Sequence, residues 1–452
     1  MKKTIFGCLG AAAVAFALHF TMAHVQAGLF SSCNPCDEVA CNPCDEATCD
    51  PCDAACGPRA GQWNFGGWIE AGFYANQYGR RNIYSNYEFA GKHNLVLPLD
   101  NAVANNAYPG NYRRLNNVAL SDPQMNQAWI FVERTLNTRR GLDFGGRVDF
   151  LYGTDGRFTQ SDGLEFRSLS DSWAVRRENS WGQGDYFASF AQIYGEVGFN
   201  NVSVKAGKFL SPMGSNSIMS PERFFYSLTH AFAAMPVTHT GVIGTWSPSK
   251  NFSAFGGWVN GEDRTFYNND GTEGADNAAL FGVEYALNKR VNLAYTALIG
   301  KSKNGAGRTE FDVDYFVHSF VVNAKLNKRW DYTFEWTLRN EKENRDPAYR
   351  YCGGAYGINQ ELVYRLNSRW AVGGRAEWMH LYGNYGDYFG EGFYGAPDIY
   401  AVVFGANWTP NKWLTVKPEV RYDWTDPKEA TVFDNYTRHK QFSGGVSAIV
   451  KF

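Results

Sequence analysis

The chain has 452 residues, 19% of them charged and 16% aromatic, with 47 glycines and 16 prolines. Its formal net charge of −2 excludes the strongly basic character that nucleic-acid partners require. After residue 30 the sequence has no apolar run near the roughly 18 residues that a membrane helix needs, which excludes helical spans. Membrane strands are not excluded, because their apolar residues alternate with polar ones.

Residues 1–27 have the pattern of a secretory signal peptide. Lys2 and Lys3 supply the positive charge, residues 5–20 form the apolar core, and Val25-Gln26-Ala27 offers small residues for cleavage. We therefore expect export to an oxidising compartment.

Residues 28–61 form an acidic, cysteine-rich segment with three Cys-x-x-Cys pairs on an eight-residue period and one further cysteine. Three interpretations remain open: disulfides within the segment or to neighbouring chains, soft-metal binding, and a flexible spacer with local disulfides only. We expect a periplasmic tether that cross-links the protein into the cell envelope, with no metal or cofactor. The expected cross-linking cysteines are Cys33, Cys36, Cys41, Cys44, Cys49, Cys52 and Cys56.

Residues 62–452 predict an all-β fold, a transmembrane antiparallel up-and-down β-barrel of about 16 strands. Each expected strand is long enough to cross a bilayer at a tilt. The expected strands are 63–78, 125–135, 143–153, 188–199, 202–210, 240–246, 252–260, 278–285, 291–300, 313–326, 330–339, 355–366, 370–382, 399–408, 414–424 and 441–452.

The connections between these strands alternate between short and long. The short ones are rich in Asn, Ser and Pro, which set tight turns. Short turns on one side and long loops on the other are typical of an outer-membrane barrel, with periplasmic turns and extracellular loops. The expected long loops are 79–124, 154–187, 211–239, 261–277, 301–312, 340–354, 383–398 and 425–440.

The last strand shows the period-two pattern most clearly. Phe442, Val446 and Val450 fall on one face with the terminal Phe452, and mostly polar residues fall on the other, with Ile449 as the exception. An apolar edge at the end of a soluble chain would invite aggregation, whereas a closed barrel pairs it with the first strand. A terminal Phe of this kind resembles the signal that the outer-membrane barrel-assembly machinery reads, so Phe452 is the expected assembly signal.

The polar strand faces predict a wet lumen with charges of both signs. A charge facing lipid would cost about 2–4 kcal/mol at the midplane, so the alternation assigns these side chains inward. Mixed charge gives no strong ion preference but can set up a transverse field. Paired stabilising ladders without a role in selectivity are the open alternative. The expected pore-lining residues are Glu70, Arg147, Asp149, Glu196, Lys205, Asp331, Glu335, Arg339, Glu361, Arg365, Arg375, Glu377, Lys417, Glu419, Arg421 and Asp423.

Residues 211–239 are the expected constriction loop. Ser211-Pro212-Met213-Gly214 ends the preceding strand, and Arg223, Phe224, Phe225 and Tyr226 make the loop basic and aromatic. Such a loop could fold inward and narrow a pore. A cap on the outer rim remains the alternative.

Several short motifs occur along the strands and at their ends. They are residues 66–72 (GGWIEAG), 126–129 (NQAW), 132–134 (VER), 147–155 (RVDFLYGTD), 207–209 (GKF), 213–214 (MG), 236–241 (PVTHTG) and 260–261 (NG). In combination they resemble the putative β-barrel porin-2, OmpL-like family over residues 62–452. The resemblance implies an outer-membrane, porin-like channel and supplies no catalytic residues. It does not extend to the cysteine-rich segment.

The sequence thus predicts an outer-membrane porin for passive diffusion of small hydrophilic solutes or ions. The alternative is a structural or adhesive envelope barrel that is cross-linked through its cysteines. We expect no enzyme, because His318 and His380 have no evident Ser with an orienting partner. Expected partners are outer-membrane lipid, the assembly machinery and solutes. A homotrimer, which is common among porins of this size, and a disulfide-linked envelope protein stay open.

Overall fold

The computed structural model describes residues 61–78, 123–138, 141–171, 174–178, 181–183, 186–265, 277–306, 309–343, 352–383, 398–426, 433 and 438–452. The expected signal peptide and all the expected cross-linking cysteines lie outside these residues. In the part of the chain that is described, no helix is long and apolar enough to cross a membrane.

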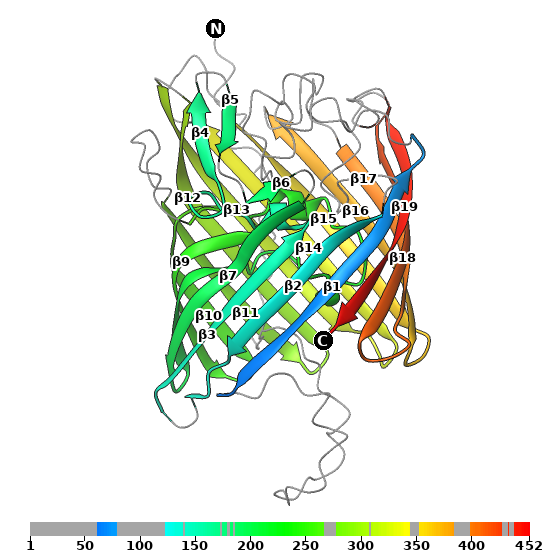
Figure 1. Ribbon diagram of the computed structural model, residues 1–452, viewed down its shortest axis with the longest axis horizontal. Helices are drawn as coiled ribbons and strands as arrows, with labels where there is room; N and C mark the ends of the chain where they lie inside the picture. Colours follow the sequence, from blue (N-terminus) through cyan, green and yellow to red (C-terminus); the bar gives the residue numbers. More distant parts are fainter. Residues whose placement is uncertain are drawn as a thin grey trace, which may run out of the picture.

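The described residues form one closed antiparallel barrel (Figure 1). Its sheet has 17 strands, and one of them, β6 (Gly182–Gln183), is a two-residue pairing on β7, so the wall has 16 long strands, as predicted. Each wall strand pairs with its neighbour in the chain, and β1 pairs with β19 to close the barrel. The wall strands are β1 (Trp63–Asn76), β2 (Gln124–Arg134), β3 (Asp143–Gly153), β7 (Tyr186–Phe199), β8 (Val202–Leu210), β9 (Thr238–Ser249), β10 (Phe252–Val259), β11 (Asn277–Asn288), β12 (Val291–Ala306), β13 (Thr309–Lys325), β14 (Trp330–Glu343), β15 (Cys352–Arg365), β16 (Trp370–Gly383), β17 (Asp398–Trp408), β18 (Leu414–Thr425) and β19 (Lys440–Lys451).

Smaller elements lie in the connections. The strands β4 (Arg167–Asp171) and β5 (Ala174–Glu178) form a separate hairpin, and α2 (Gly156–Thr159) is a single helical turn that follows β3. Two 3-10 turns, η3 (Ser220–Glu222) and η4 (Ala231–Ala234), lie between β8 and β9.

The seam between β1 and β19 explains how the chain ends. The register runs from Trp68 opposite Lys451 to Asn76 opposite Ser443, and Phe452 exchanges two backbone hydrogen bonds of 3.0 Å with Gly67. The apolar face of β19 points outward, and Phe452 is 67% exposed. Pairing of the last strand with the first removes the free edge that would otherwise promote aggregation.

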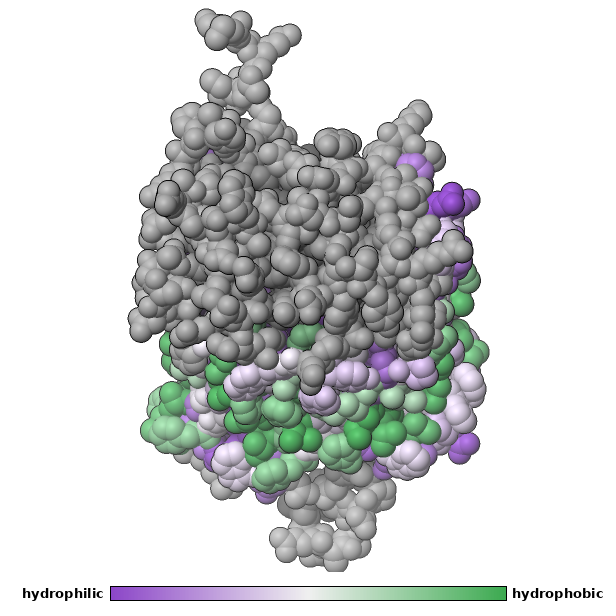
Figure 2. All heavy atoms as spheres, turned by 45° about the horizontal axis from the view of Figure 1, so that its top comes forward, coloured by the Kyte–Doolittle hydropathy of each residue, from purple (hydrophilic) through white to green (hydrophobic). Residues whose placement is uncertain are grey.

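The outer surface of the wall is apolar. Phe65, Phe144 and Phe404 point outward and are 77%, 62% and 64% exposed. Figure 2 shows hydrophobic residues gathered over the lower part of the visible wall. Such a continuous apolar surface requires lipid around it, because a water-exposed patch of this extent would drive association.

Four of the short turns share one local structure. In the turns that begin at Asn288, Asn327 and Asn367, the Asn Oδ1 accepts the backbone N–H groups two and three residues later, at 2.8–3.1 Å. Asn411 makes the same pair of contacts at 3.1 and 2.9 Å. An Asn side chain mimics a backbone turn in this way, which is why Asn begins the tight turns that the sequence predicted.

One expected loop was wrong. Residues 301–312 are not a long loop, since β12 and β13 extend as paired strands until Ala306 lies opposite Thr309. The sequence of residues 301–304, KSKN, is polar throughout, so it lacks the alternation of a lipid-facing strand. Backbone pairing can continue without that alternation once a hairpin extends beyond the apolar band.

Candidate channel constriction

Residues 211–237, called the inner loop below, connect β8 to β9 and lie inside the barrel. Ser215 Oγ donates to Glu335 Oε2 of β14 at 2.5 Å. The His230 N–H donates to Glu377 Oε2 of β16 at 2.6 Å. Both carboxylates face the barrel interior, on strands far along the wall from β8 and β9. The inner loop therefore crosses between opposite walls and does not rest on the rim.

Wall cations and amides hold the backbone of the inner loop. Lys417 Nζ donates to the carbonyl oxygens of Ser220 and Arg223 at 2.7 and 2.5 Å. From β2, which is separated from β18 by β19 and β1, Gln127 Nε2 donates to the Ile218 carbonyl oxygen at 2.7 Å. Hydrogen bonds from charged groups are the stronger ones, so these contacts fix the path of the loop.

Apolar contacts add to this anchoring. Inward side chains of β1, β2, β3 and β19 form a cluster with the loop, and this cluster explains why Ile449 breaks the polar pattern of its face, since it is fully buried there. Part of the lumen wall is therefore apolar where the loop packs, because burial of such surface is favourable. The wall members are Trp68, Trp129, Leu151 and Ile449 together with Ala191 of β7, and the loop members are Ile218, Met219, Leu228, Phe232 and Val237.

A network of alternating charges lies under the middle of the inner loop. Arg421 Nη1 contacts Glu377 Oε1 and Arg421 Nη2 contacts Asp423 Oδ1, both at 2.8 Å. Arg375 Nε shares the same Glu377 oxygen at 2.8 Å, and its Nη1 donates to the Ser227 carbonyl oxygen at 2.9 Å. Each of these wall charges has a partner of opposite sign, which is the condition for keeping charges in a low-dielectric site.

The predicted loop residues pack against the wall. Tyr226 OH donates to Asn126 Oδ1 at 2.8 Å, and the Arg375 guanidinium lies 4.7 Å from the ring centroid of Phe225. A Cβ atom on Gly373 would come within 2.7 Å of the Phe224 ring, so this aromatic pair fits against positions without side chains.

Arg223 is the basic member of that motif. Its Nη1 donates to the Ile218 carbonyl oxygen at 2.7 Å, and its Nη2 lies 3.6 Å from Glu70 Oε2 and 3.9 Å from Asp155 Oδ2. Burial raises the pKa of the Asp155 carboxyl to about 7, although Arg223 and the 2.8 Å hydrogen bond from Gln127 act in the opposite direction. Two buried carboxyls therefore share one guanidinium.

A second inward segment, residues 154–166, supports the base of the inner loop. Lys208 Nζ of β8 donates to Glu165 Oε1 and to the Thr159 carbonyl oxygen, both at 2.8 Å. Asp263, beyond the end of β10, accepts from the Thr238 N–H at 2.7 Å, and burial raises the pKa of its carboxyl to about 7.

Glu222 differs from its neighbours because its side chain is exposed to solvent inside the barrel. Ser217 Oγ donates to its Oε2 at 2.8 Å. The charges of Arg147 and Asp149 act on this carboxyl from the β3 wall. An accessible carboxylate beside wall charges is therefore the clearest sign of water-filled space at the level of the loop.

The structure places all sixteen expected pore-lining residues on inward-facing strand positions. Most of them are covered, so they hold the inner loop or one another. Their role in permeation stays a prediction. The buried ones are Glu70, Arg147, Asp149, Glu335, Arg339, Arg375, Glu377, Lys417, Glu419, Arg421 and Asp423. The more accessible ones are Glu196, Lys205, Asp331, Glu361 and Arg365.

Sequence reasoning missed Glu222, Asp155, Glu165 and Glu262. All four lie in connections, where no strand alternation indicates which way a side chain points. Glu262 contacts Arg339 Nη2 at 2.8 Å from such a connection. An acidic residue beside a proline in the expected constriction loop, as in Pro221-Glu222, was the one available signal.

Within the described ranges no group of three or more His, Cys, Asp and Glu side chains could hold a metal ion. A closed antiparallel barrel with an apolar outer band and a charged interior defines a porin-like protein of the outer membrane. The chain belongs to the family described as Putative beta-barrel porin-2, OmpL-like, whose profile matches residues 62–452.

Solved barrels share this fold at low sequence identity. In vitro folded OmpT of Vibrio cholerae, an outer membrane protein in trimer form, has a TM-score of 0.51 and 11% identity over 87% of this chain and 100% of that one. An anion-selective porin from Comamonas acidovorans has a TM-score of 0.50 and 9% identity over 86% of this chain and 99% of that one. A comparison with curated protein sequences found no match.

Proposed function

We propose that the protein is an outer-membrane porin whose barrel holds a water-filled channel for passive diffusion of small hydrophilic solutes or ions. One observation carries the proposal: the inner loop is bonded to the wall at β2 and at β16, while the Glu222 carboxylate inside the barrel stays exposed to solvent. A barrel of about 16 strands is too wide for its own side chains to fill. The inner loop then sets the width of the passage.

The chemistry of the passage favours polar solutes without a strong preference for one ion sign. Glu222 supplies a negative charge from the loop, and Lys205 on the β8 wall is half-buried with its Nζ 4.3 Å from the Tyr194 ring centroid. Opposed charges across a narrow opening order water and polar solutes. The porin from Comamonas acidovorans is anion-selective, and we do not extend that selectivity to this chain.

Planar bilayers and liposome swelling test the proposal. The purified protein should produce discrete conductance steps, and swelling rates should fall as the solute grows from pentose to trisaccharide. Heat-modifiable mobility on gels would confirm that each preparation is a folded barrel. A folded barrel that conducts no ions and admits no sugar would contradict the proposal.

The cysteine-rich segment supports a second proposal, that the barrel is cross-linked into the envelope through Cys33 to Cys56. The segment has seven cysteines, so pairing within it leaves one over, and such a cysteine in an exported chain favours a link to another chain. Non-reducing gels should show high-mass species that disappear when a reductant is added. If these species are absent, the cross-linking proposal is wrong and the channel proposal is unaffected. We also propose that the protein forms a homotrimer, which chemical cross-linking in the native membrane would test. Phe452 is proposed as the assembly signal, and its removal should lower the amount of folded barrel in the membrane.

A further inference from the structure

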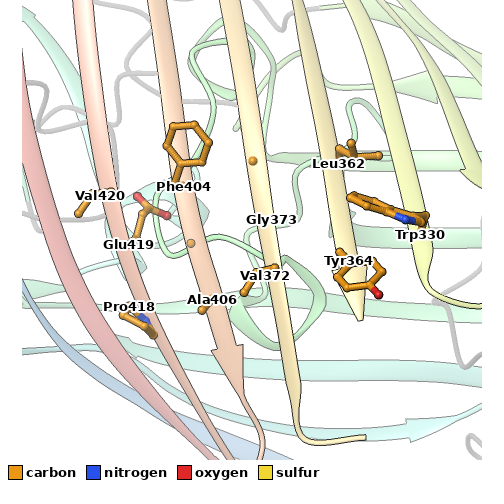
Figure 3. A pocket seen from close by; sticks show the side chains of 12 residues that line it. Trp330, Leu362, Tyr364, Val372, Gly373, Phe404, Ala406, Pro418, Glu419 and Val420 are labelled. Carbon is orange, nitrogen blue, oxygen red and sulfur yellow. The ribbon is translucent and has the colours of Figure 1, made fainter. Parts of the chain in front are cut away.

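An apolar groove of about 620 Å³ lies on the outer face of the wall, across β14 to β18 (Figure 3). Trp330, Leu362 and Tyr364 form one side, and Pro418 and Val420 form the other. The floor consists of small outward residues and bare backbone. The floor residues are Val372, Gly373, Gly374, Gly405 and Ala406, and Phe404 rises between the two sides.

Strand pairing is interrupted in this floor. The register between β17 and β18 passes from Gly405 opposite Glu419 directly to Trp408 opposite Val416, so Ala406 has no strand partner on the β18 side. Pro418 lies in this gap and has no N–H to donate, which is the reason that proline is confined to edges and irregular positions in sheets. The recess is therefore built into the wall by the sequence.

The turn-side end of the groove carries a positive charge. Trp330 begins β14 immediately after the turn at Asn327, and its ring centroid lies 4.6 Å from that of Tyr364. Arg329 Nη1 donates to Tyr364 OH at 3.0 Å and is exposed. No carboxylate of the described residues forms an ion pair with Arg329. The guanidinium is thus fixed at the mouth of an apolar groove.

The same turns are basic all along this part of the wall. The turns from β9–β10 to β17–β18 contain Lys or Arg and no Asp or Glu. Attraction of an anionic headgroup to such a rim is worth about 1 kcal/mol per cation close to the surface. The basic residues are Lys250, Lys289, Arg290, Lys328, Arg329, Arg369 and Lys412.

We propose that this groove binds one anionic glycerophospholipid of the turn-side leaflet, with an acyl chain along the floor and its phosphate at Arg329. The groove has the volume of a small-molecule site, lies within the lipid-facing band and ends in a cation and two interfacial aromatic rings. A flexible chain can enter a recess between Tyr364 and Val420, whereas the protruding Phe404, 64% exposed, keeps a second rigid barrel away from the floor. The proposal does not depend on whether the barrel conducts.

Two substitutions test separately the part of the groove that binds the acyl chain and the part that binds the headgroup. A Cβ atom on Gly374 would lie 3.6 Å from Phe404, an ordinary contact, so Gly374→Leu fills the groove without a backbone clash. Ala279→Leu on β11 is the matched control, since Ala279 faces lipid on another part of the wall. Arg329→Gln removes the cation, and Arg290→Gln removes its equivalent from a turn of the same kind that does not border the groove.

Native mass spectrometry of the detergent-purified protein, with phosphatidylglycerol or phosphatidylcholine added, measures how many lipid molecules each variant retains. The wild type should retain one phosphatidylglycerol in preference to phosphatidylcholine. Gly374→Leu should reduce retention of both lipids about tenfold, and Arg329→Gln should lower the preference for phosphatidylglycerol about fivefold. Both controls should behave as the wild type.

Three outcomes would overturn the proposal. The first is a wild type that shows no preference between the lipids, and the second is Gly374→Leu retaining lipid as well as Ala279→Leu does. The third is a change in the number of protomers in the Gly374→Leu particle at an unchanged lipid count, which would make a second copy of the chain the occupant.

Discussion

Two parts of the lumen wall differ in chemistry. On β14 to β18 the inward positions are densely charged, with Glu335, Arg375, Glu377 and Arg421 all buried. On β10 to β12 the inward positions are mainly small or apolar. Those of β10 to β12 include Gly257, Val259, Ala278, Leu280, Gly282, Thr296, Leu298 and Gly300.

The difference shows how one loop is held in two ways. The charged wall bonds directly to the backbone of the inner loop, as in the contact between Glu377 and the His230 N–H. The apolar wall instead packs against Met213, Ala234 and Met235 of the same loop. Directional bonds fix the path of the loop at one side, and non-directional burial fills the other.

The largest expected effect follows from removal of one charge of the charged wall. Arg421→Met leaves Glu377 and Asp423 buried with fewer partners, so the free energy of unfolding should fall by about 3–5 kcal/mol. Urea unfolding of the barrel in vesicles measures this. Arg365→Met is the control, since the Arg365 side chain is 51% exposed in its pair with Asp331 and should contribute less than about 1 kcal/mol. Equal losses would mean that the network does not anchor the loop.

A cavity on the apolar wall should cost slightly less. Leu298 is fully buried in the apolar cluster that contains Met213 and Met235 of the inner loop. Leu298→Ala should therefore lower the free energy of unfolding by about 3 kcal/mol. Ile299→Ala removes a neighbouring side chain that faces lipid and is 49% exposed, and its loss should be clearly smaller. If Ile299→Ala is less stable than Leu298→Ala, the inner loop does not pack on the apolar wall as described.

The pH dependence of Asp155 gives an effect whose size changes with conditions. Its pKa is raised to about 7 from a model-compound value of 3.8, so the folded protein holds a proton that the unfolded chain has lost. Stability linked to this group is therefore present at low pH and is lost as pH rises from about 4 to 7. Asp155→Asn should be more stable than the wild type at pH 8, by up to about 4 kcal/mol, and not at pH 4.

Asp263→Asn, which removes the other carboxyl with a raised pKa, should change stability in the same direction. Identical pH profiles for Asp155→Asn and the wild type would show that folding does not raise the pKa of Asp155.

Glu222 should have the smallest effect on stability, but its substitution should change the ion selectivity of the channel. Glu222→Gln removes an exposed charge inside the barrel, so the free energy of unfolding should change by less than about 0.5 kcal/mol. The ratio of cation to anion permeability, from reversal potentials in a salt gradient, should fall a few-fold. Asp314→Asn, at a side chain that is 42% exposed in its pair with Lys301, should leave the ratio unchanged.

The sequence predicted the wall well and its interior less well. Alternation on β18, where Val416 and Val420 face out and Lys417 and Arg421 face in, was confirmed because lipid imposes it on each strand. The inward Ile449 and the partners of the inner loop follow from tertiary contacts that have no period in sequence. The position of Glu222, which the proposed channel depends on, could be read only from the fold.

Deletion of residues 215–232 tests the central claim that the inner loop narrows the passage. Heat-modifiable mobility would show that the deletion variant still forms a barrel, and single-channel recording in planar bilayers would compare it with the wild type. Conductance should rise substantially, since the chain that crosses the lumen has been removed. A folded variant with unchanged conductance would contradict the account.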